Sequence, residues 1–142
     1  MQLCAPFNIK HMAYKRKARI VFFCGSHPAP VSLATHYANT LGSDSMEARA
    51  AVLPGVAGEV PVLDDAALAW ADLLVTLDAA ALAAKPPLRA GLQHRHYPFE
   101  PIPDVADKAA WRELAARIRQ RVEGMIGGMR LLQKAAHASD GL

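Results

Sequence analysis

The sequence is poor in cysteine and has no long apolar run. Its 142 residues include two cysteines, Cys4 and Cys24, which are too few for a disulfide framework. No stretch approaches the roughly 20 consecutive apolar residues that a helix needs to cross a bilayer. The N-terminus also lacks the charged-then-apolar order of a secretion signal. We therefore expect a cytoplasmic protein without membrane contact, in which Cys24 is a free thiol.

Acidic residues are absent from the first nineteen positions. This segment holds five lysine and arginine residues, so the remaining 11 of 16 stand against 13 acidic residues, a balance of −2. The formal charge of +3 thus comes from the N-terminal segment, and the rest of the chain does not have the charge of a nucleic-acid-binding surface. The sequence predicts a flexible basic arm over 1–18, one domain over 19–134 and a frayed tail over 135–142. The arm is either a solvated leader or a contact for an acidic partner.

Short apolar runs alternate with segments of helical periodicity along the rest of the chain. The longest expected helix follows a proline-rich segment and carries Trp111, Leu114 and Ile118 at three- and four-residue steps. Alternating strands and helices predict an α/β fold with a three-layer, doubly wound, parallel four-stranded sheet. Ligands bind such sheets at the carboxyl ends of the strands. The expected strands are Ile20 to Phe23, a run within Met46 to Leu53, Asp72 to Asp78, and Gln93 to Tyr97.

Cys24 follows the first expected strand and opens a short turn-rich loop before a helix that Ser32 is placed to cap. A thiolate at a helix N-terminus is stabilised by the helix dipole and by backbone amides, and the same amides can hold a tetrahedral oxyanion. The pattern therefore predicts a nucleophilic cysteine in a phosphate-binding loop. The alternative is that Cys24 is a small buried residue at the end of a strand. The expected ligand-binding residues are Gly25, Ser26, His27 and Ser32.

The stretch from Val21 to Ala34 resembles the first strand, phosphate loop and first helix of the low-molecular-weight protein tyrosine phosphatases and the related arsenate reductases. The resemblance continues over about residues 19–132 and implies a flavodoxin-like fold. It also implies that Cys24 is the nucleophile and that Asp104 protonates the leaving group. Glu100-Pro101 is an alternative position for this acid, and capping of the next helix is an alternative role for Asp104. Other matching segments are Glu47 to Pro54, Ala71 to Asp78, Ile102 to Val105, and Trp111 to Leu114.

The loop departs from the family at the positions that hold phosphate. The family has a cysteine, five residues, an arginine and then Ser or Thr, whereas this chain has Pro30 and Val31 at the last two positions. Pro28 and Pro30 also have no N–H group to donate. Since loss of one preorganised donor costs about 10²–10³ in rate, we expect weak or no activity on phosphotyrosine. His27 replaces a family asparagine that braces the loop, and it either braces the loop or pairs with the thiolate.

Three other functions remain open. The first is a non-catalytic binding or regulatory module, with a phosphate-like anion or a phosphoprotein as the partner. The second is a cysteine phosphocarrier similar to the sugar-phosphotransferase IIB components. The third is an arsenate reductase that uses its single loop cysteine with a low-molecular-weight thiol, because thioredoxin-linked reduction requires further cysteines. We expect no cofactor in any of these cases.

Two further groups of residues are relevant to the site. His94 and His96 alternate on an expected strand, so their rings share one face, and a carboxylate would be needed beside them to hold a metal. We interpret them as ordinary histidines and expect no metal. Arg49 and Arg95 are the candidates to supply the guanidinium that the loop lacks.

Overall fold

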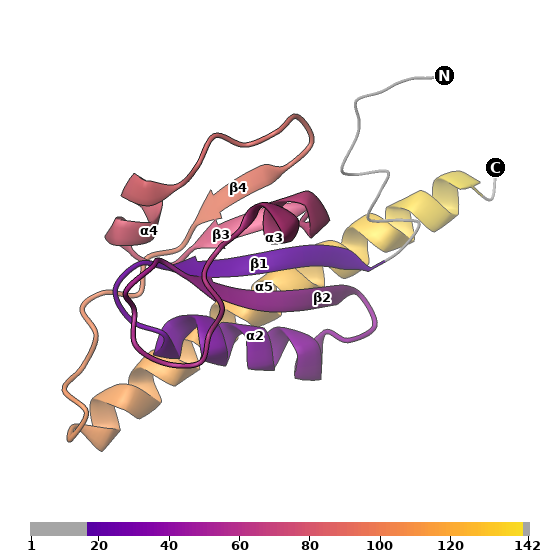
Figure 1. Cartoon of the computed structure of the whole chain (residues 1–142). Helices are drawn as coiled ribbons and strands as arrows, with labels where there is room; N and C mark the ends of the chain where they lie inside the picture. The colour runs from indigo at the N-terminus through magenta and orange to yellow at the C-terminus, as the bar shows by residue number, and fades with distance from the viewer. Residues whose placement is uncertain (1–16, 141–142) are drawn as a thin grey trace.

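The computed structural model describes residues 17–140, and these form a four-stranded parallel sheet with helices on both faces (Figure 1). The order of the strands in the sheet is β2-β1-β3-β4. This arrangement confirms the predicted α/β, doubly wound, flavodoxin-like fold. The strands are β1 (Ala18–Cys24), β2 (Met46–Val52), β3 (Leu73–Thr76) and β4 (Gln93–His96). The helices are α2 (Ala29–Leu41), α3 (Asp65–Trp70), α4 (Ala79–Ala84) and α5 (Lys108–Asp140).

Strand β1 is central and buried on both faces. Alternate side chains of a strand point to opposite faces, and Ile20 and Phe22 belong to one core cluster while Val21 and Phe23 belong to the other. The first cluster is closed by α2 and α5 and the second by α3 and α4. The continuous apolar run of β1 is therefore explained by a sheet that is covered on both sides.

The carboxyl end of β1 is the point where the sheet changes winding direction. From β1 the chain passes through α2 to β2 on one side, and β3 lies on the other side of β1. The backbone of the segment after β3 continues the sheet, because the Leu77 amide donates to the Phe23 carbonyl. Cys24 thus lies at the topological switch point, where doubly wound sheets bind ligands.

Helix α2 begins earlier than the sequence predicts. Pro28 is the N-cap residue, no side chain caps the helix, and Ser32 lies inside the first turns with its amide donating to the Pro28 carbonyl. The predicted capping role of Ser32 is therefore wrong. The two prolines explain the early start, since the first N–H groups of a helix have no intrahelical partner and proline loses nothing there.

Helix α5 is longer than predicted. Its backbone is helical to Asp140, which corrects the frayed tail expected from residue 135. The helix continues through Gly127 and Gly128. The segment that follows them is rich in alanine and leucine, which are strong helix formers.

The predicted N-terminal arm lies outside the described residues except for its last two positions. Ala18 is already part of β1 and is buried, and its amide donates to the carbonyl of Ser45. The ordered domain therefore begins one residue before the predicted boundary. Within residues 17–140, none of the helices combines the length and the apolar character that crossing a membrane requires.

Candidate functional site

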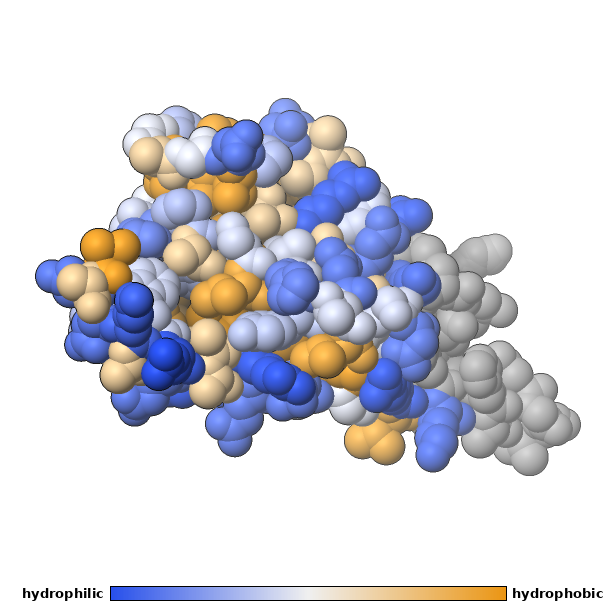
Figure 2. Space-filling model, turned by 90° about the horizontal axis from the view of Figure 1, so that it is seen from below, coloured by the Kyte–Doolittle hydropathy of each residue, from blue (hydrophilic) through white to orange (hydrophobic). Residues whose placement is uncertain are grey.

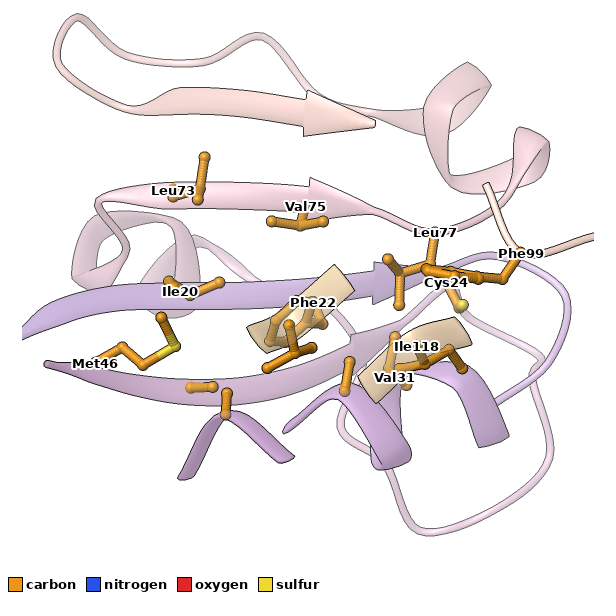
Figure 3. Packing of buried hydrophobic residues seen from close by; sticks show 14 of the residues in the cluster. Ile20, Phe22, Cys24, Val31, Met46, Leu73, Val75, Leu77, Phe99 and Ile118 are labelled. Carbon is orange, nitrogen blue, oxygen red and sulfur yellow. The ribbon is translucent and has the colours of Figure 1, made fainter. Parts of the chain in front are cut away.

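Cys24 ends β1 and has no exposed surface. Figure 3 shows its side chain beside Leu77 and Phe99, with Val31 and Ile118 in the same cluster. Apolar side chains from the sheet edge and from α2 and α5 therefore surround the thiol. The loop that follows, residues 25–28, turns directly into α2.

Asp78 is bonded to the amides of the cysteine loop. This residue follows β3, is 2% exposed and caps α4 through the Ala81 amide at 2.8 Å. One carboxylate oxygen also accepts the Gly25 amide at 2.9 Å, and the other accepts the Ser26 amide at 3.0 Å and the Ser26 hydroxyl at 2.8 Å. A carboxylate from the protein itself is therefore bound where the loop would present donors to phosphate.

The loop lies so close to α4 that only glycine fits next to Cys24. A Cβ atom on Gly25 would lie 2.5 Å from the Ala80 Cβ and 2.8 Å from both the Ala80 carbonyl carbon and the Ala81 nitrogen. Two of these three atoms belong to the backbone of α4 and cannot move independently of the helix. Gly25 is therefore required by close packing, and this packing brings the amides within reach of Asp78.

The ionisation of Cys24 and Asp78 follows from this arrangement. Burial is the largest influence on Cys24, and together with the nearby charge of Asp78 it raises the pKa of the thiol far above its ordinary value. The hydrogen bond from the Val31 amide acts in the opposite direction, and burial together with the Asp78 charge outweighs it. Burial also acts on Asp78, but the hydrogen bonds from Ala81, Gly25 and Ser26 outweigh it and lower the pKa of this carboxyl. The site thus holds a thiol and a carboxylate rather than a thiolate.

No guanidinium replaces the missing arginine within the described part of the chain. Pro30 and Val31 are buried in the first turn of α2. Of the two arginines that were candidates, Arg49 lies over the Trp70 ring with its guanidinium carbon 4.0 Å from the ring centroid. Arg95 donates to the carbonyl of the adjacent His94. The loop therefore has neither a guanidinium nor a hydroxyl at the family positions.

His27 braces the loop by a local hydrogen bond. Its Nδ1 accepts the Ala29 amide at 3.3 Å, and its ring lies 5.9 Å from the ring of Trp111, centroid to centroid. Of the two predicted roles, the contacts of His27 are those of a brace.

The two acidic candidates lie in different surroundings. Asp104 is exposed, its carboxylate accepts the Ala106 amide at 2.9 Å, and its carbonyl accepts the Trp111 indole N–H at 3.0 Å. Glu100 accepts the Ala79 amide at 3.1 Å, next to Asp78, and its charge contributes to the raised pKa of Cys24. Asp104 therefore forms a local turn before α5, whereas the Glu100 carboxylate contacts the helix start that adjoins the loop. Helix α5 is capped by Asp107 rather than by Asp104.

His94 and His96 share one face of β4, as expected. The Nε2 atom of His94 lies 2.9 Å from Thr76 Oγ1, and the Nδ1 atom of His96 lies 2.7 Å from the same oxygen. Burial, with the positive charges of Lys85, His96 and Arg95, lowers the pKa of His94. No group of three or more metal-ligating side chains occurs in residues 17–140.

The sequence alone does not reveal Asp78 as a partner of the cysteine loop. Asp78 was read only as the end of a strand, although an aspartate directly before an alanine-rich segment is a clear helix N-cap signal. Nothing in the sequence indicates that this same carboxylate reaches across to a loop 53 residues earlier. The hydroxyl of Thr76 between two histidines was missed for the same reason.

Comparisons with solved structures find this fold in two groups of enzymes. A thioredoxin-dependent arsenate reductase of Corynebacterium glutamicum is similar with a TM-score of 0.63 and 15% identity, over 87% of this chain and 67% of its own. An arsenate reductase in the phosphate-binding state has a TM-score of 0.54 and 15% identity, over 79% and 98%. A low-molecular-weight protein tyrosine phosphatase of Streptococcus pyogenes has a TM-score of 0.56 and 9% identity, over 78% and 91%. No family model and no curated protein matches the chain.

Proposed function

We propose that this chain, which has the fold of the low-molecular-weight phosphatases and arsenate reductases, is a non-hydrolysing protein with a binding or regulatory role. The observation that carries this proposal is the Asp78 carboxylate, which accepts the amides of Gly25 and Ser26 and whose negative charge raises the pKa of the Cys24 thiol. The loop is therefore closed by an internal anion. Phosphate-monoester hydrolysis needs the opposite charge pattern at the same position.

Two energetic terms oppose phosphate binding at this loop. The first is loss of the hydrogen bonds to Asp78, since a hydrogen bond to a charged group contributes about 1.5–3 kcal/mol. The second is repulsion, since two like unit charges 4 Å apart near a protein surface interact with about 4 kcal/mol. Phosphotyrosine has no arginine here to offset either term. We therefore expect neither phosphate affinity nor thiolate attack at Cys24.

Arsenate reduction coupled to thioredoxin is disfavoured by the cysteine content. Such a relay forms a disulfide between two protein thiols and passes it on. Cys24 is the sole cysteine of residues 17–140, and it is a buried neutral thiol. Reduction with a low-molecular-weight thiol meets the same obstacle, because the thiolate and not the thiol is the nucleophile.

Hydrolysis of para-nitrophenyl phosphate tests the proposal. We expect no turnover above that of the Cys24→Ser variant between pH 5 and 8. As a matched control, Arg112→Gln changes an exposed residue of α5 and should behave as the unaltered protein does. Turnover that disappears in Cys24→Ser but persists in Arg112→Gln would overturn the proposal.

A variant with the family's residues at positions 30 and 31 extends this test. A Pro30→Arg, Val31→Ser variant restores the two family positions but leaves Asp78 in place. We expect this variant to remain inactive, because the amides of Gly25 and Ser26 still bind the carboxylate. Activity in this variant would show that the loop opens in spite of Asp78.

A further inference from the structure

A second concave region lies beside the cysteine site, between the segment after β4 and the middle of α5. It encloses about 590 Å³ and is lined by residues 96–99 on one side and by Arg117, Gln120 and Arg121 on the other. Small-molecule sites in proteins have volumes of about 300–1,000 Å³. The region begins at the carboxyl end of β4, which is the edge where sheets of this kind bind ligands. No residue of the cysteine loop lines it.

The charged side chains that line this cavity are two arginines. Arg117 and Arg121 are four residues apart on α5, so their Cβ atoms are neighbours on the helix surface at about 5–6 Å. None of the residues that line the cavity is acidic. Among the described residues, no ion pair joins either arginine to a carboxylate. Two guanidinium groups therefore face the cavity without a counter-charge.

Aromatic rings hold these guanidinium groups in place. The guanidinium carbon of Arg121 lies 4.2 Å from the centroid of the Tyr97 ring, and that of Arg117 lies 6.0 Å from the centroid of the Phe99 ring. Such contacts orient a guanidinium by its face and leave the N–H groups at its edge free to donate. Less side-chain freedom is then lost when an anion binds.

His96 adds a nitrogen at the β4 side of the cavity. Its Nδ1 is engaged by Thr76 Oγ1 at 2.7 Å, while its Nε2 has no hydrogen-bond partner among the described residues. The Thr76 hydroxyl oxygen also lies 2.9 Å from Nε2 of His94. Its contact with Nδ1 fixes the orientation of the His96 ring. Nε2 is thus the ring nitrogen left for a ligand.

We propose that this cavity binds a small phosphomonoester, with Arg117 and Arg121 on the phosphate oxygens and with Gln120 and His96 completing the donors. Two uncompensated positive charges match a dianion, and the guanidinium fork matches the geometry of phosphate oxygens. The volume exceeds that of phosphate alone, so it leaves room for the organic part of the ligand. This inference rests on the binding role proposed above and concerns a site that is separate from Cys24.

The face of the molecule seen from below does not favour a protein partner held by apolar contacts. On the face seen from below, hydrophilic residues separate the apolar ones into small patches (Figure 2). Apolar docking surfaces on soluble proteins are usually contiguous and larger. That face therefore does not present a broad apolar surface for docking.

Titration of the full chain with inorganic phosphate and with glycerol phosphate, followed by NMR, tests the inference. We expect saturable shifts of the Arg117 and Arg121 Nε–H signals and of the His96 ring signals. Glycerol phosphate should bind more tightly than inorganic phosphate, and glycerol or sodium chloride at equal ionic strength should cause no such shifts. Shifts spread evenly over all exposed arginine and lysine residues, or no shifts at all, would overturn it.

Substitutions locate the effect. Arg117→Gln and Arg121→Gln should each weaken binding about tenfold or more, since each removes a charge-assisted contact, whereas Arg112→Gln should stay within about twofold. Arg121→Lys keeps the charge without the fork and should bind with intermediate affinity. Equal weakening by Arg112→Gln contradicts a defined site.

The same spectra separate this inference from the proposed function. Shifts of the Gly25 and Ser26 amides on addition of phosphate would contradict the closed loop, whatever happens at α5. Unchanged signals at both places would contradict the α5 site and leave the closed loop standing.

Discussion

Asp78 has two roles that the family resemblance did not reveal. It caps α4 and it also binds the amides of the cysteine loop, so that one carboxylate satisfies donors from two elements. The sequence shows the missing arginine and hydroxyl directly, because their positions are fixed by spacing from Cys24. It does not show the carboxylate that fills the loop, because that contact depends on how β1 and β3 pair. Loss of the family residues is therefore readable from sequence, and closure of the loop is not.

Gly25 is the residue whose replacement most directly tests the packing of the loop. In Gly25→Ala the new Cβ would meet the Ala80 Cβ at 2.5 Å and the backbone of α4 at 2.8 Å. We expect a loss of about 1–3 kcal/mol in the free energy of unfolding, which is the usual cost of overpacking. Urea-induced unfolding measures it.

Gly128→Ala is the matched control for this substitution. Gly128 is exposed in α5 and has nothing within 4 Å of an added Cβ. Alanine there should raise the free energy of unfolding by about 0.5–1 kcal/mol, because it restricts the unfolded chain and favours the helix. Equal effects of the two substitutions would mean that the loop and α4 are not in the close contact described.

At the scale of elements, the sequence predicted the strands more accurately than the helix starts. The apolar runs of β1 and β3 are continuous because both faces are covered, and such runs are read from composition alone. The start of α2 was placed at Ser32 by its capping preference, whereas the prolines at 28 and 30 had already begun the helix. The capping preference of Ser32 and the preference of proline for the first turn predict different starts for α2, and the helix begins where the prolines predict.

Helices α3 and α4 offer a matched pair of N-caps. Asp64 and Asp78 each accept an amide three residues later at 2.8 Å, but Asp64 is exposed and Asp78 also holds the loop. Asp64→Ala should lower the free energy of unfolding by about 1 kcal/mol, the usual contribution of an N-cap. Asp78→Ala should lower the free energy of unfolding by about 3 kcal/mol or more, since the amides of Ala81, Gly25 and Ser26 all lose their acceptor.

Chemical denaturation of both variants measures the two losses in the free energy of unfolding. The difference between the two costs measures how strongly the loop depends on Asp78. Equal costs would show that Asp78 acts as a helix cap alone, and the loop amides would then be available to a ligand.

At the scale of the whole molecule, the fold is predicted well and the surroundings of the cysteine are not. The sheet order and the position of Cys24 match what the sequence predicted, and the neighbours with this fold are named as arsenate reductases and a phosphatase at 9–15% identity. The topology explains why the cysteine remains at the switch point, since that position also packs the core. The cavity beside α5 was not predicted, because Arg117 and Arg121 read as the solvated face of an amphipathic helix until β4 and its following loop are placed against them.

The ionisation of Cys24 within the folded chain is the most direct test of the closed loop. A Cys4→Ser variant leaves Cys24 as the only thiol, and its rate of alkylation by iodoacetamide is measured from pH 6 to 10 in native buffer and in urea. In urea the rate should rise with a midpoint near the ordinary thiol pKa of about 8.5. The raised pKa of the folded thiol has a definite sign: above about pH 8.5 the unfolded chain loses the proton that the folded chain keeps, so stability falls as pH rises.

In native buffer we expect slow alkylation with no midpoint in this range, at a rate set by opening of the fold. The Asp78→Asn variant should react faster, because it removes the negative charge beside the thiol. A midpoint below about 7 in the native protein would mean that Cys24 is a stabilised thiolate in an open anion-binding loop, and it would contradict closure of the loop by Asp78.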